Sequence, residues 1–285
     1  MDNNQSIIAG IDEAGRGPLF GPVVACAVIF NGDINISDIS DSKKLSAIKR
    51  QSIYNELIAD NIEYGIGIVN ENVIDEINIL NATKKAMLLS VQNLQTIPNK
   101  LLIDGNQLID TRLKQEAIVK GDQKIAEISA ASIIAKVTRD NIIYSYDKIF
   151  PMLALSKHKG YGTKKHIESL YKYGATSIHR KTFRPVCEIE NQDMQKYESC
   201  DIVQYGLGLI KKGLSVSYFN TKEKVSIIHI YKDYNVYSIF INNKQADVGR
   251  SIISEIKEKD SILNKRLDVI YLDNGNAKII KSCQI

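Results

Sequence analysis

Several residue types that define whole classes of protein are scarce in this chain. Its 285 residues include four cysteines, five prolines and no tryptophan. The cysteines are widely scattered and form no CxxC pair, which argues against a zinc knuckle or a disulfide framework and fits a reducing compartment. The four histidines form neither an HxxxH nor an HExxH pair, and no GxSxG sequence is present. The common zinc-protease and serine-hydrolase patterns are therefore absent.

Long hydrophobic runs are also missing. The longest unbroken apolar run is Val23–Phe30, eight residues, whereas a membrane-spanning helix needs about 20. The first six residues carry no Lys or Arg, and no apolar signal-peptide core follows them. We therefore expect no membrane association and a cytoplasmic location.

The charge is weak overall but unevenly distributed. The net charge of +4 is too small to indicate a nucleic-acid partner by itself. Between Lys157 and Arg184, however, eight Lys and Arg residues stand against a single acid, Glu168, and four Tyr or Phe residues lie among them. Cations interleaved with aromatic rings suit phosphate tracking and base stacking. A solvated helical face explains the same composition equally well.

Apolar strand-like runs alternate with amphipathic helical spacing in the first two thirds of the chain, which predicts an α/β fold. The 44% of apolar residues is enough for a sizeable core. The predicted strands are 7–11, 23–30, 63–69, 100–104 and 117–119. The predicted helices are 46–61, 73–92 with an interruption near 78–81, 129–147 and 166–172, and a loop is expected at 156–162.

The pattern changes at about residue 190. Residues 192–285 contain no proline, and they show strand-like runs on both sides of a charged amphipathic helix. We predict two domains: residues 1–190, and a small accessory α+β domain of unknown role at 191–285. The strands predicted in the second domain are 225–231, 236–241, 267–272 and 277–280, and the helix is 247–264.

Four acidic residues stand at the ends of apolar strands or next to them. Asp12 and Glu13 end the first strand, Asp104 ends another, and Asp122 comes just before the long helix. Converging carboxylates raise one another's pKa unless a divalent cation neutralises them. Mg²⁺ and Mn²⁺ prefer such oxygen ligands. Taken singly, each acid is also explained as a turn or cap residue.

A glycine-rich loop follows the first strand. In Gly15-Arg16-Gly17-Pro18 the glycines allow a backbone to approach a phosphate or a sugar, and the arginine supplies a forked donor. The loop does not match the GxxxxGK[ST] pattern, so it is not a Walker loop.

Seven short motifs follow one another along the chain: IDEAGRGP (11–18), DSKKL (41–45), LIDGN (102–106), KGD (120–122), SAASIIAKVTRD (129–140), HKGY (158–161) and HRKTF (179–183). In type and order they resemble bacterial ribonuclease HII, over about residues 6–187. Two positions depart from the usual family pattern: Gly162 stands where many members have proline, which predicts a slightly looser loop, and Thr182 where serine is commoner.

The resemblance implies a ribonuclease H-like fold, with a central mixed β-sheet flanked by helices, in a catalytic domain spanning 1–190. It implies an endonuclease that hydrolyses the RNA strand of RNA–DNA hybrids and incises at ribonucleotides embedded in duplex DNA, as in ribonucleotide excision repair. The products carry a 5′-phosphate and a 3′-hydroxyl. A catalytically inactive nucleic-acid-binding module on the same fold is the alternative. The implied catalytic and metal-binding residues, holding two Mg²⁺ or Mn²⁺ ions, are Asp12, Glu13, Asp104 and Asp122.

Further positions are implied to bind the substrate, an RNA–DNA hybrid or a ribonucleotide-containing duplex. Gly15, Arg16 and Gly17 correspond to the loop that senses the ribose 2′-hydroxyl. Tyr161 corresponds to the tyrosine that stacks on the following deoxyribose and helps to mark the RNA–DNA junction. The protein is expected to act as a monomer. The remaining implied substrate-binding residues are Lys43, Lys44, Ser132 with its neighbour Ser129, and Arg180 in the last motif.

The C-terminal region weakly resembles the YraN-like family of predicted nucleases, on residues 205–213 and 267–271. The acidic strand positions of that family are not visible here, so a related domain would have lost catalysis. An unrelated small packing domain is the alternative.

Overall fold

The computed structural model describes residues 7–30, 46–60, 62–189, 192–220, 225–232, 235–242, 265–273 and 276–284. The chain forms two compact units, and each is described by itself. The first comprises residues 1–140, 160–162 and 178–188, and the second 141–159, 163–177 and 189–285. No helix of the described part is both long and apolar enough to cross a membrane.

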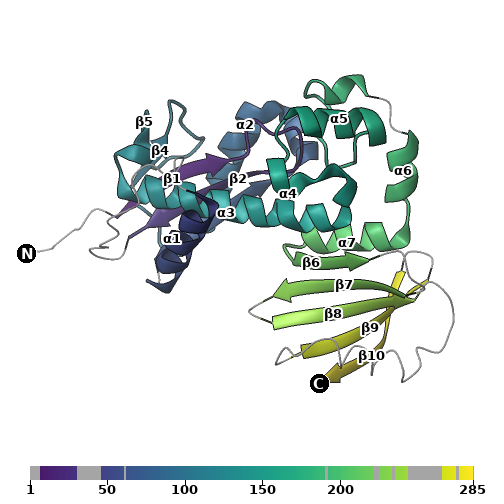
Figure 1. Ribbon diagram of the computed structural model, residues 1–285. Helices are drawn as coiled ribbons and strands as arrows, with labels where there is room; N and C mark the ends of the chain where they lie inside the picture. Colours follow the sequence, from purple (N-terminus) through teal and green to yellow (C-terminus); the bar gives the residue numbers. More distant parts are fainter. Residues whose placement is uncertain are drawn as a thin grey trace, which may run out of the picture. The chain divides into compact units, whose positions relative to one another are not determined.

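A five-stranded mixed sheet forms the centre of the first unit, in the order β3-β2-β1-β4-β5 (Figure 1). β1 is antiparallel to β2, and β2 to β3, whereas β1 runs parallel to β4, and β4 to β5. The predicted mixed sheet is therefore confirmed. The strand predicted at 117–119 is observed earlier, at 114–118. The strand bounds are β1 Ile8–Ala14, β2 Val23–Ile29, β3 Glu63–Val69, β4 Lys100–Asp104 and β5 Lys114–Ile118.

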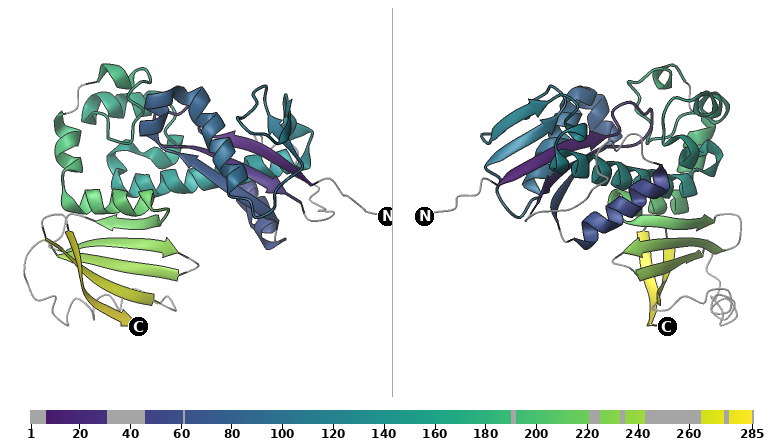
Figure 2. Two further views of the ribbon diagram at one scale, coloured as in Figure 1. Left: turned by 180° about the vertical axis from the view of Figure 1, so that it is seen from behind. Right: turned by 60° about the vertical axis from the view of Figure 1, so that its left-hand side comes forward.

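Helices cover both faces of this sheet. On one face, Ile74 and Met87 of α2 (Glu71–Gln92) pack with the buried side chains of β1, β2 and β4. Seen from behind in Figure 2, α2 lies across the strands. On the other face, α1 (Ala47–Ala59) and the first half of α3 (Ala126–Ile149) pack against β2. The chain thus alternates strands with helices that sandwich the sheet, as its apolar spacing predicts.

The predicted interruption of the second helix is present at Asn78. This residue has a φ of 65°, and its side-chain oxygen accepts hydrogen bonds from the N–H groups of Leu80 (3.0 Å) and Asn81 (3.1 Å). A positive φ is uncommon for residues other than glycine but is enriched in asparagine, and the Asn78 side chain caps the turn that follows it. α2 is therefore two helical pieces that meet at a capped kink.

The start of α3 lies directly on β1, and Gly10 makes this possible. A Cβ at position 10 would collide with the backbone of Glu127 and Ile128, which begin the helix. The close approach brings α3 next to the end of β1, where the Ser132 side chain is hydrogen-bonded to the carboxylate of Asp12. Since β1 carries two of the four acids, this contact positions one wall of the candidate site.

The second unit contains short helices and a second sheet. The expected loop at 156–162 is wrong at its start, because Leu155–His158 forms the helical turn α4. The four strands predicted in the tail are confirmed with longer bounds, whereas α6, α7 and β6 were not predicted. The helix predicted at 247–264 lies outside the described residues. The elements are η2 (Pro151–Leu153), α4, α5 (Lys164–Tyr173), α6 (Gln192–Glu198), α7 (Asp201–Lys211), β6 (Ser215–Asn220), β7 (Val225–Lys232), β8 (Asn235–Asn242), β9 (Lys265–Asp273) and β10 (Asn276–Gln284), with the sheet order β10-β9-β8-β7-β6.

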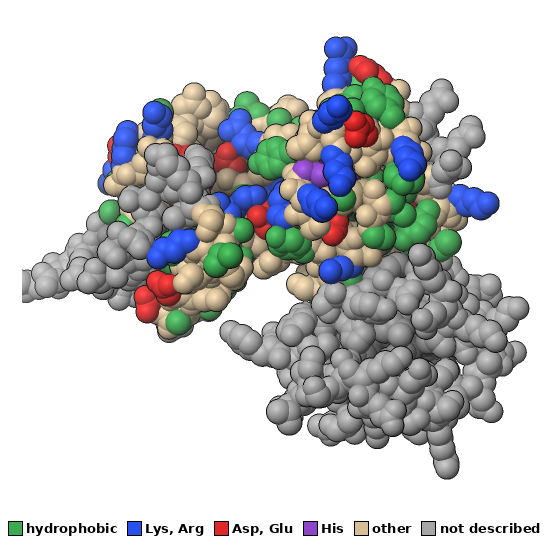
Figure 3. All heavy atoms as spheres, in the orientation of Figure 1, with side chains coloured by type: hydrophobic (Ala, Val, Ile, Leu, Met, Phe, Trp, Pro, Cys, Tyr) green, Lys and Arg blue, Asp and Glu red, His purple; other side chains and the backbone are tan. Residues whose placement is uncertain are grey.

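The lysine- and arginine-rich segment from Lys157 to Arg184 begins in this unit. Lys157, Lys164, Lys165 and Lys172 are exposed, and Lys159 lies over the ring of Tyr144 at 3.8 Å. On the face drawn in Figure 3, Lys and Arg side chains gather around α4 and α5. The arrangement fits the phosphate-tracking interpretation and the solvated-face interpretation alike, so both stay open.

Residues on both sides of position 190 contact each other within the second unit. The Tyr197 hydroxyl donates to the carbonyl of Ile149 at 2.6 Å. The Glu198 carboxylate accepts from the N–H of Ser177 at 2.9 Å and from its hydroxyl at 2.8 Å. α6 therefore stabilises the end of α3 and the turn after α5, and the division into domains at 190 stays a prediction.

These contacts predict that the length of a truncated chain decides its stability. A chain that ends after residue 189 is expected to have a free energy of unfolding about 2 kcal/mol lower than one that ends after Gly213, because it lacks the hydrogen bonds of α6. Urea denaturation of both truncated chains measures the difference. Equal stabilities would show that α6 contributes nothing to the fold.

Candidate active site

Three of the four predicted acids stand at one end of the first sheet because β1 and β4 are parallel neighbours. Ile11 pairs with Ile103, so Asp12 and Asp104 follow side by side, and Glu13 comes next to Asp12. The Asp104 Oδ1 accepts a hydrogen bond from the Gly121 N–H at 2.7 Å. Gly121 opens the turn η1 (Gly121–Gln123), which carries the fully buried fourth acid, Asp122.

Burial and mutual repulsion act on two of these carboxyl groups. Burial raises the pKa of Asp12 well above its ordinary value, and the charges of Glu13 and Asp104 raise it further. Hydrogen bonds from the Ser132 side chain and from the Glu13 N–H, the latter at 2.7 Å, oppose this shift. Burial likewise raises the pKa of Glu13, where Arg16 opposes and Asp104 adds to the effect. Keeping these carboxyl groups ionised therefore costs free energy, and a bound cation would offset that cost.

The donors fit a hard divalent cation, because all four side chains are carboxylates and the charges of Glu13 and Asp104 act against that of Asp12. Within the described ranges, no three His, Cys, Asp or Glu side chains converge closely enough to form a complete metal site. The fold thus brings the acids into one region, but their side-chain oxygens do not converge on a single position in this conformation.

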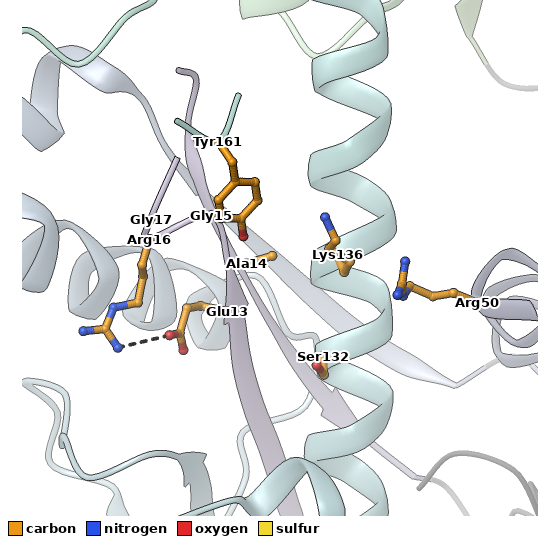
Figure 4. A pocket seen from close by; sticks show the side chains of 9 residues that line it. All are labelled: Glu13, Ala14, Gly15, Arg16, Gly17, Arg50, Ser132, Lys136 and Tyr161. Carbon is orange, nitrogen blue, oxygen red and sulfur yellow. Dashed lines mark hydrogen bonds and ion pairs between the residues drawn. The ribbon is translucent and has the colours of Figure 1, made fainter. Parts of the chain in front are cut away.

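A pocket of about 320 Å³ opens beside the acids. In Figure 4, Arg16 extends toward Glu13, with an Nη1–Oε1 distance of 3.4 Å, and the Tyr161 ring stands on the same side. Arg50 from α1 and Lys136 from α3 lie on the opposite side. A pocket with cations on two sides and an aromatic ring suits a phosphodiester backbone. Its lining residues are Glu13, Ala14, Gly15, Arg16, Gly17, Arg50, Ser132, Lys136 and Tyr161.

Two lining cations were not predicted from the sequence. Lys136 lies one helical turn after Ser132, so its place on the same face of α3 was a usable signal. Burial lowers the pKa of Lys136, while its ion pair with Asp140 at 2.6 Å opposes the shift. Arg50 belongs to α1, and no pattern in the sequence links that helix to the pocket.

The glycine-rich loop is held from behind by two buried arginines. Arg180 donates to the carbonyls of Gly15 (2.5 Å), Arg16 (2.8 Å) and Gly21 (3.0 Å). Arg139 donates to those of Phe20 and Pro22, each at 3.0 Å. Both side chains have no exposed surface. Burial lowers their pKa values to about 9 for Arg180 and about 10 for Arg139, and both therefore remain charged at neutral pH.

Tyr161 is held next to this loop by the backbone. The N–H of Leu19 donates to the carbonyl of Gly160 at 2.8 Å, directly before the tyrosine. The ring is 44% exposed, so one side of it is available to a ligand. The position of Tyr161 therefore depends on the segment that follows Gly15-Arg16-Gly17.

The predicted substrate-binding residues fall into three groups. Gly15, Arg16, Gly17, Ser132 and Tyr161 line the pocket, and Ser132 also contacts the carboxylate of Asp12. Ser129 is buried at the start of α3, and Arg180 lies behind the loop, where in this conformation it acts on the backbone and not directly on a substrate. Lys43 and Lys44 lie outside the described residues.

A mixed sheet between helices, with acids at the ends of two central parallel strands and a basic pocket beside them, defines a nuclease of the ribonuclease H class. The family model for ribonuclease HII matches residues 9–186, so the chain belongs to the ribonuclease HII family. The predicted family and the predicted ribonuclease H-like fold are thereby confirmed. The match ends before the C-terminal region, whose resemblance to YraN-like proteins stays a prediction.

Individual proteins show how far the similarity extends. The ribonuclease HII of Acetivibrio thermocellus is 56% identical over 177 residues, which are 62% of this chain and 69% of that protein. The ribonuclease HII of Francisella tularensis subsp. mediasiatica is 53% identical over 186 residues, 65% of this chain and all of that protein. The crystal structure of ribonuclease H2 from Pyrococcus horikoshii superposes with a TM-score of 0.54 at 26% identity, over 68% of this chain and 100% of that one.

The raised pKa of Asp12 predicts a pH-dependent gain in stability when its charge is removed. Because the pKa is higher in the folded chain than in the unfolded chain, the metal-free protein loses stability as the pH rises through the folded pKa. Asp12→Asn is therefore expected to raise the melting temperature by about 3 °C or more at pH 8 and to have little effect below about pH 4. Thermal denaturation in EDTA at both pH values, with the exposed Asp110→Asn as control, checks this. A gain that is equal at both pH values would contradict the electrostatic explanation.

The packing of Arg139 behind the glycine-rich loop predicts that alanine is much more destabilising at Gly15 than at Gly17. Gly15 has a φ of +99°, and a Cβ there would collide with the side chain of Arg139, whereas a Cβ at Gly17 would lie 3.4 Å from Cε1 of Tyr161. Gly15→Ala is expected to lower the free energy of unfolding by about 3 kcal/mol or more, and Gly17→Ala by less than about 1 kcal/mol. Urea denaturation of both variants measures this contrast. Similar losses in the two would mean that Arg139 does not limit the space at Gly15.

Proposed function

We propose that this chain is a divalent-cation-dependent endonuclease that cleaves the RNA strand of RNA–DNA hybrids and incises at ribonucleotides embedded in duplex DNA. Membership of the ribonuclease HII family makes it a ribonuclease H of type 2, and its relatives carry the name ribonuclease HII. The observation that carries the proposal is the set of acids at the end of β1 and β4 beside a basic pocket.

On this proposal, Asp12, Glu13, Asp104 and Asp122 hold Mg²⁺ or Mn²⁺, two ions per site. Such cations, when bound, activate a water molecule and stabilise charge on the leaving oxygen, which yields a 5′-phosphate and a 3′-hydroxyl. The chain's own groups orient the ligands. The Ser132 side chain and the Glu13 N–H fix the carboxylate of Asp12, and the Gly121 N–H fixes that of Asp104.

Different pocket residues are expected to contact the phosphates, the sugar and the 2′-hydroxyl of the duplex. Arg16 on one side and Arg50 with Lys136 on the other provide charges for the phosphates that flank the scissile bond. Tyr161 offers its exposed ring to the sugar that follows the ribonucleotide. The backbone of Arg16 and Gly17 faces the 2′-hydroxyl, the group that distinguishes RNA from DNA at a single nucleotide. Lys43 and Lys44 are expected to contact further phosphates.

A catalytically inactive nucleic-acid-binding module is the second candidate. It would keep the pocket but have no use for carboxyl groups whose charge burial disfavours, and the raised pKa values of Asp12 and Glu13 therefore favour the enzyme. A monomeric state, a cytoplasmic location and a role in ribonucleotide excision repair stay predictions.

The deciding experiment uses a duplex DNA with one embedded ribonucleotide. The wild-type chain is expected to cut it with Mg²⁺ or Mn²⁺ and not in EDTA. Asp104→Asn is expected to reduce the rate by about a thousandfold or more, because a neutral amide is a poor ligand for a hard cation. Duplex binding should stay within a few-fold, as measured by fluorescence anisotropy.

Asp110→Asn, which changes an exposed acid, provides the control and should cut at the wild-type rate. Near-wild-type turnover of Asp104→Asn at saturating Mn²⁺ would refute the assignment of this residue. A wild-type chain that binds the duplex but cuts it under no metal condition would support the inactive module.

A further inference from the structure

Arg180 holds two consecutive carbonyl groups of the glycine-rich loop with one guanidinium. Its Nη2 donates to Gly15 and its Nη1 to Arg16, while its Nε donates to Gly21. The backbone N–H of Arg180 donates to the carbonyl of Leu19 at 2.9 Å, so the residue is attached to the same segment at both ends. The fork therefore fixes the orientation of two successive peptide groups.

A trans peptide points its N–H in the direction opposite to its carbonyl. The carbonyl of Gly15 shares a peptide with the N–H of Arg16, and the carbonyl of Arg16 shares one with the N–H of Gly17. Since both carbonyls point at Arg180, both N–H groups point away from it. Among the residues that the structure describes, neither N–H donates to an acceptor, and both residues line the pocket.

We propose that Arg180 is a positioning residue that sets the selectivity of the pocket for ribose, by aiming the N–H groups of Arg16 and Gly17 at the 2′-hydroxyl. The inference rests on the proposed function, since it assumes that a ribonucleotide occupies this pocket. Arg180 has no exposed surface and cannot contact the substrate in this conformation, so its effect passes through the loop.

The geometry requires a guanidinium and not only a positive charge. A lysine ammonium is a single point on a flexible stem, and it lacks the planar fork that spans two carbonyl groups. Arg180→Lys therefore keeps the charge and releases at least one of the two peptides. A released peptide rotates its N–H away from the pocket, and the 2′-hydroxyl loses that donor.

Arg139 offers a matched control. It is equally buried and also holds carbonyls of the same segment, but those of Phe20 and Pro22, which share no peptide with Arg16 or Gly17. Arg139→Lys perturbs the segment without directly releasing the two N–H groups. A merely structural contribution of Arg180 would thus appear equally in both variants.

The test compares the affinities of the full chain for two duplexes in EDTA, one of DNA alone and one with a single ribonucleotide, by fluorescence anisotropy. The wild-type chain is expected to prefer the ribonucleotide duplex about tenfold, the equivalent of about one hydrogen bond. Arg180→Lys should lose this preference while still binding the DNA duplex, and Arg139→Lys should keep it. Equal preferences in the two variants would overturn the proposal.

A second measurement needs no variant and tests the contact of the two N–H groups with the ribonucleotide, on which the proposal depends, if Arg180→Lys fails to fold. In wild-type chain labelled with ¹⁵N in Arg and Gly, the amide signals of Arg16 and Gly17 should shift with the ribonucleotide duplex and not with the DNA duplex. Unchanged signals would overturn the proposal. A wild-type chain that cuts the ribonucleotide duplex with metal but shows no preference in EDTA overturns the role of Arg180 alone, whereas a chain that never cuts overturns both.

Discussion

Five backbone carbonyls between Gly15 and Pro22 bind two guanidinium groups that have no contact with solvent, and the pocket depends on this interaction. Burying two cations is costly unless their donors are satisfied. Carbonyl dipoles satisfy them here, and the arginines in return give a glycine-containing loop a single conformation. The loop, the tyrosine attached to it and the wall of the pocket all take their places from these bonds.

The acids follow a different constraint, which is set by sheet topology. Because β1 and β4 run parallel and adjacent, two strand-ending carboxylates are forced next to each other, and burial disfavours the charge of Asp12. The strand-ending acids Asp12 and Glu13 thus come directly before the segment Gly15–Pro22, whose carbonyls the two buried arginines hold. Candidate cation ligands and a loop of fixed conformation therefore lie within a few residues of each other.

The sequence was informative wherever the determining signal is local. Strand ends could be read from apolar runs, and the break in α2 from Asn78, because an asparagine that caps the turn after it is a local property of the chain. The buried position of Arg180 could not be read, since it results from contacts with residues more than 150 positions away. Arg50 gave no signal for the same reason. α7 was missed because Gly206 and Gly208 are poor helix formers, and packing in the folded chain outweighs their propensity.

The hydrogen bond between Leu19 and Gly160 has a consequence for substrate geometry. It joins the residue before Tyr161 to a point only two positions after Gly17, so the ribose-facing loop and the exposed ring are separated by a fixed length of backbone. On the proposed function, this length of backbone sets the spacing between the N–H groups that face the 2′-hydroxyl and the ring that faces the following sugar. The register in which the chain recognises an RNA–DNA junction is then set by the number of residues between Gly17 and Leu19. Side chains along this stretch can vary without shifting that register, but an insertion or a deletion cannot.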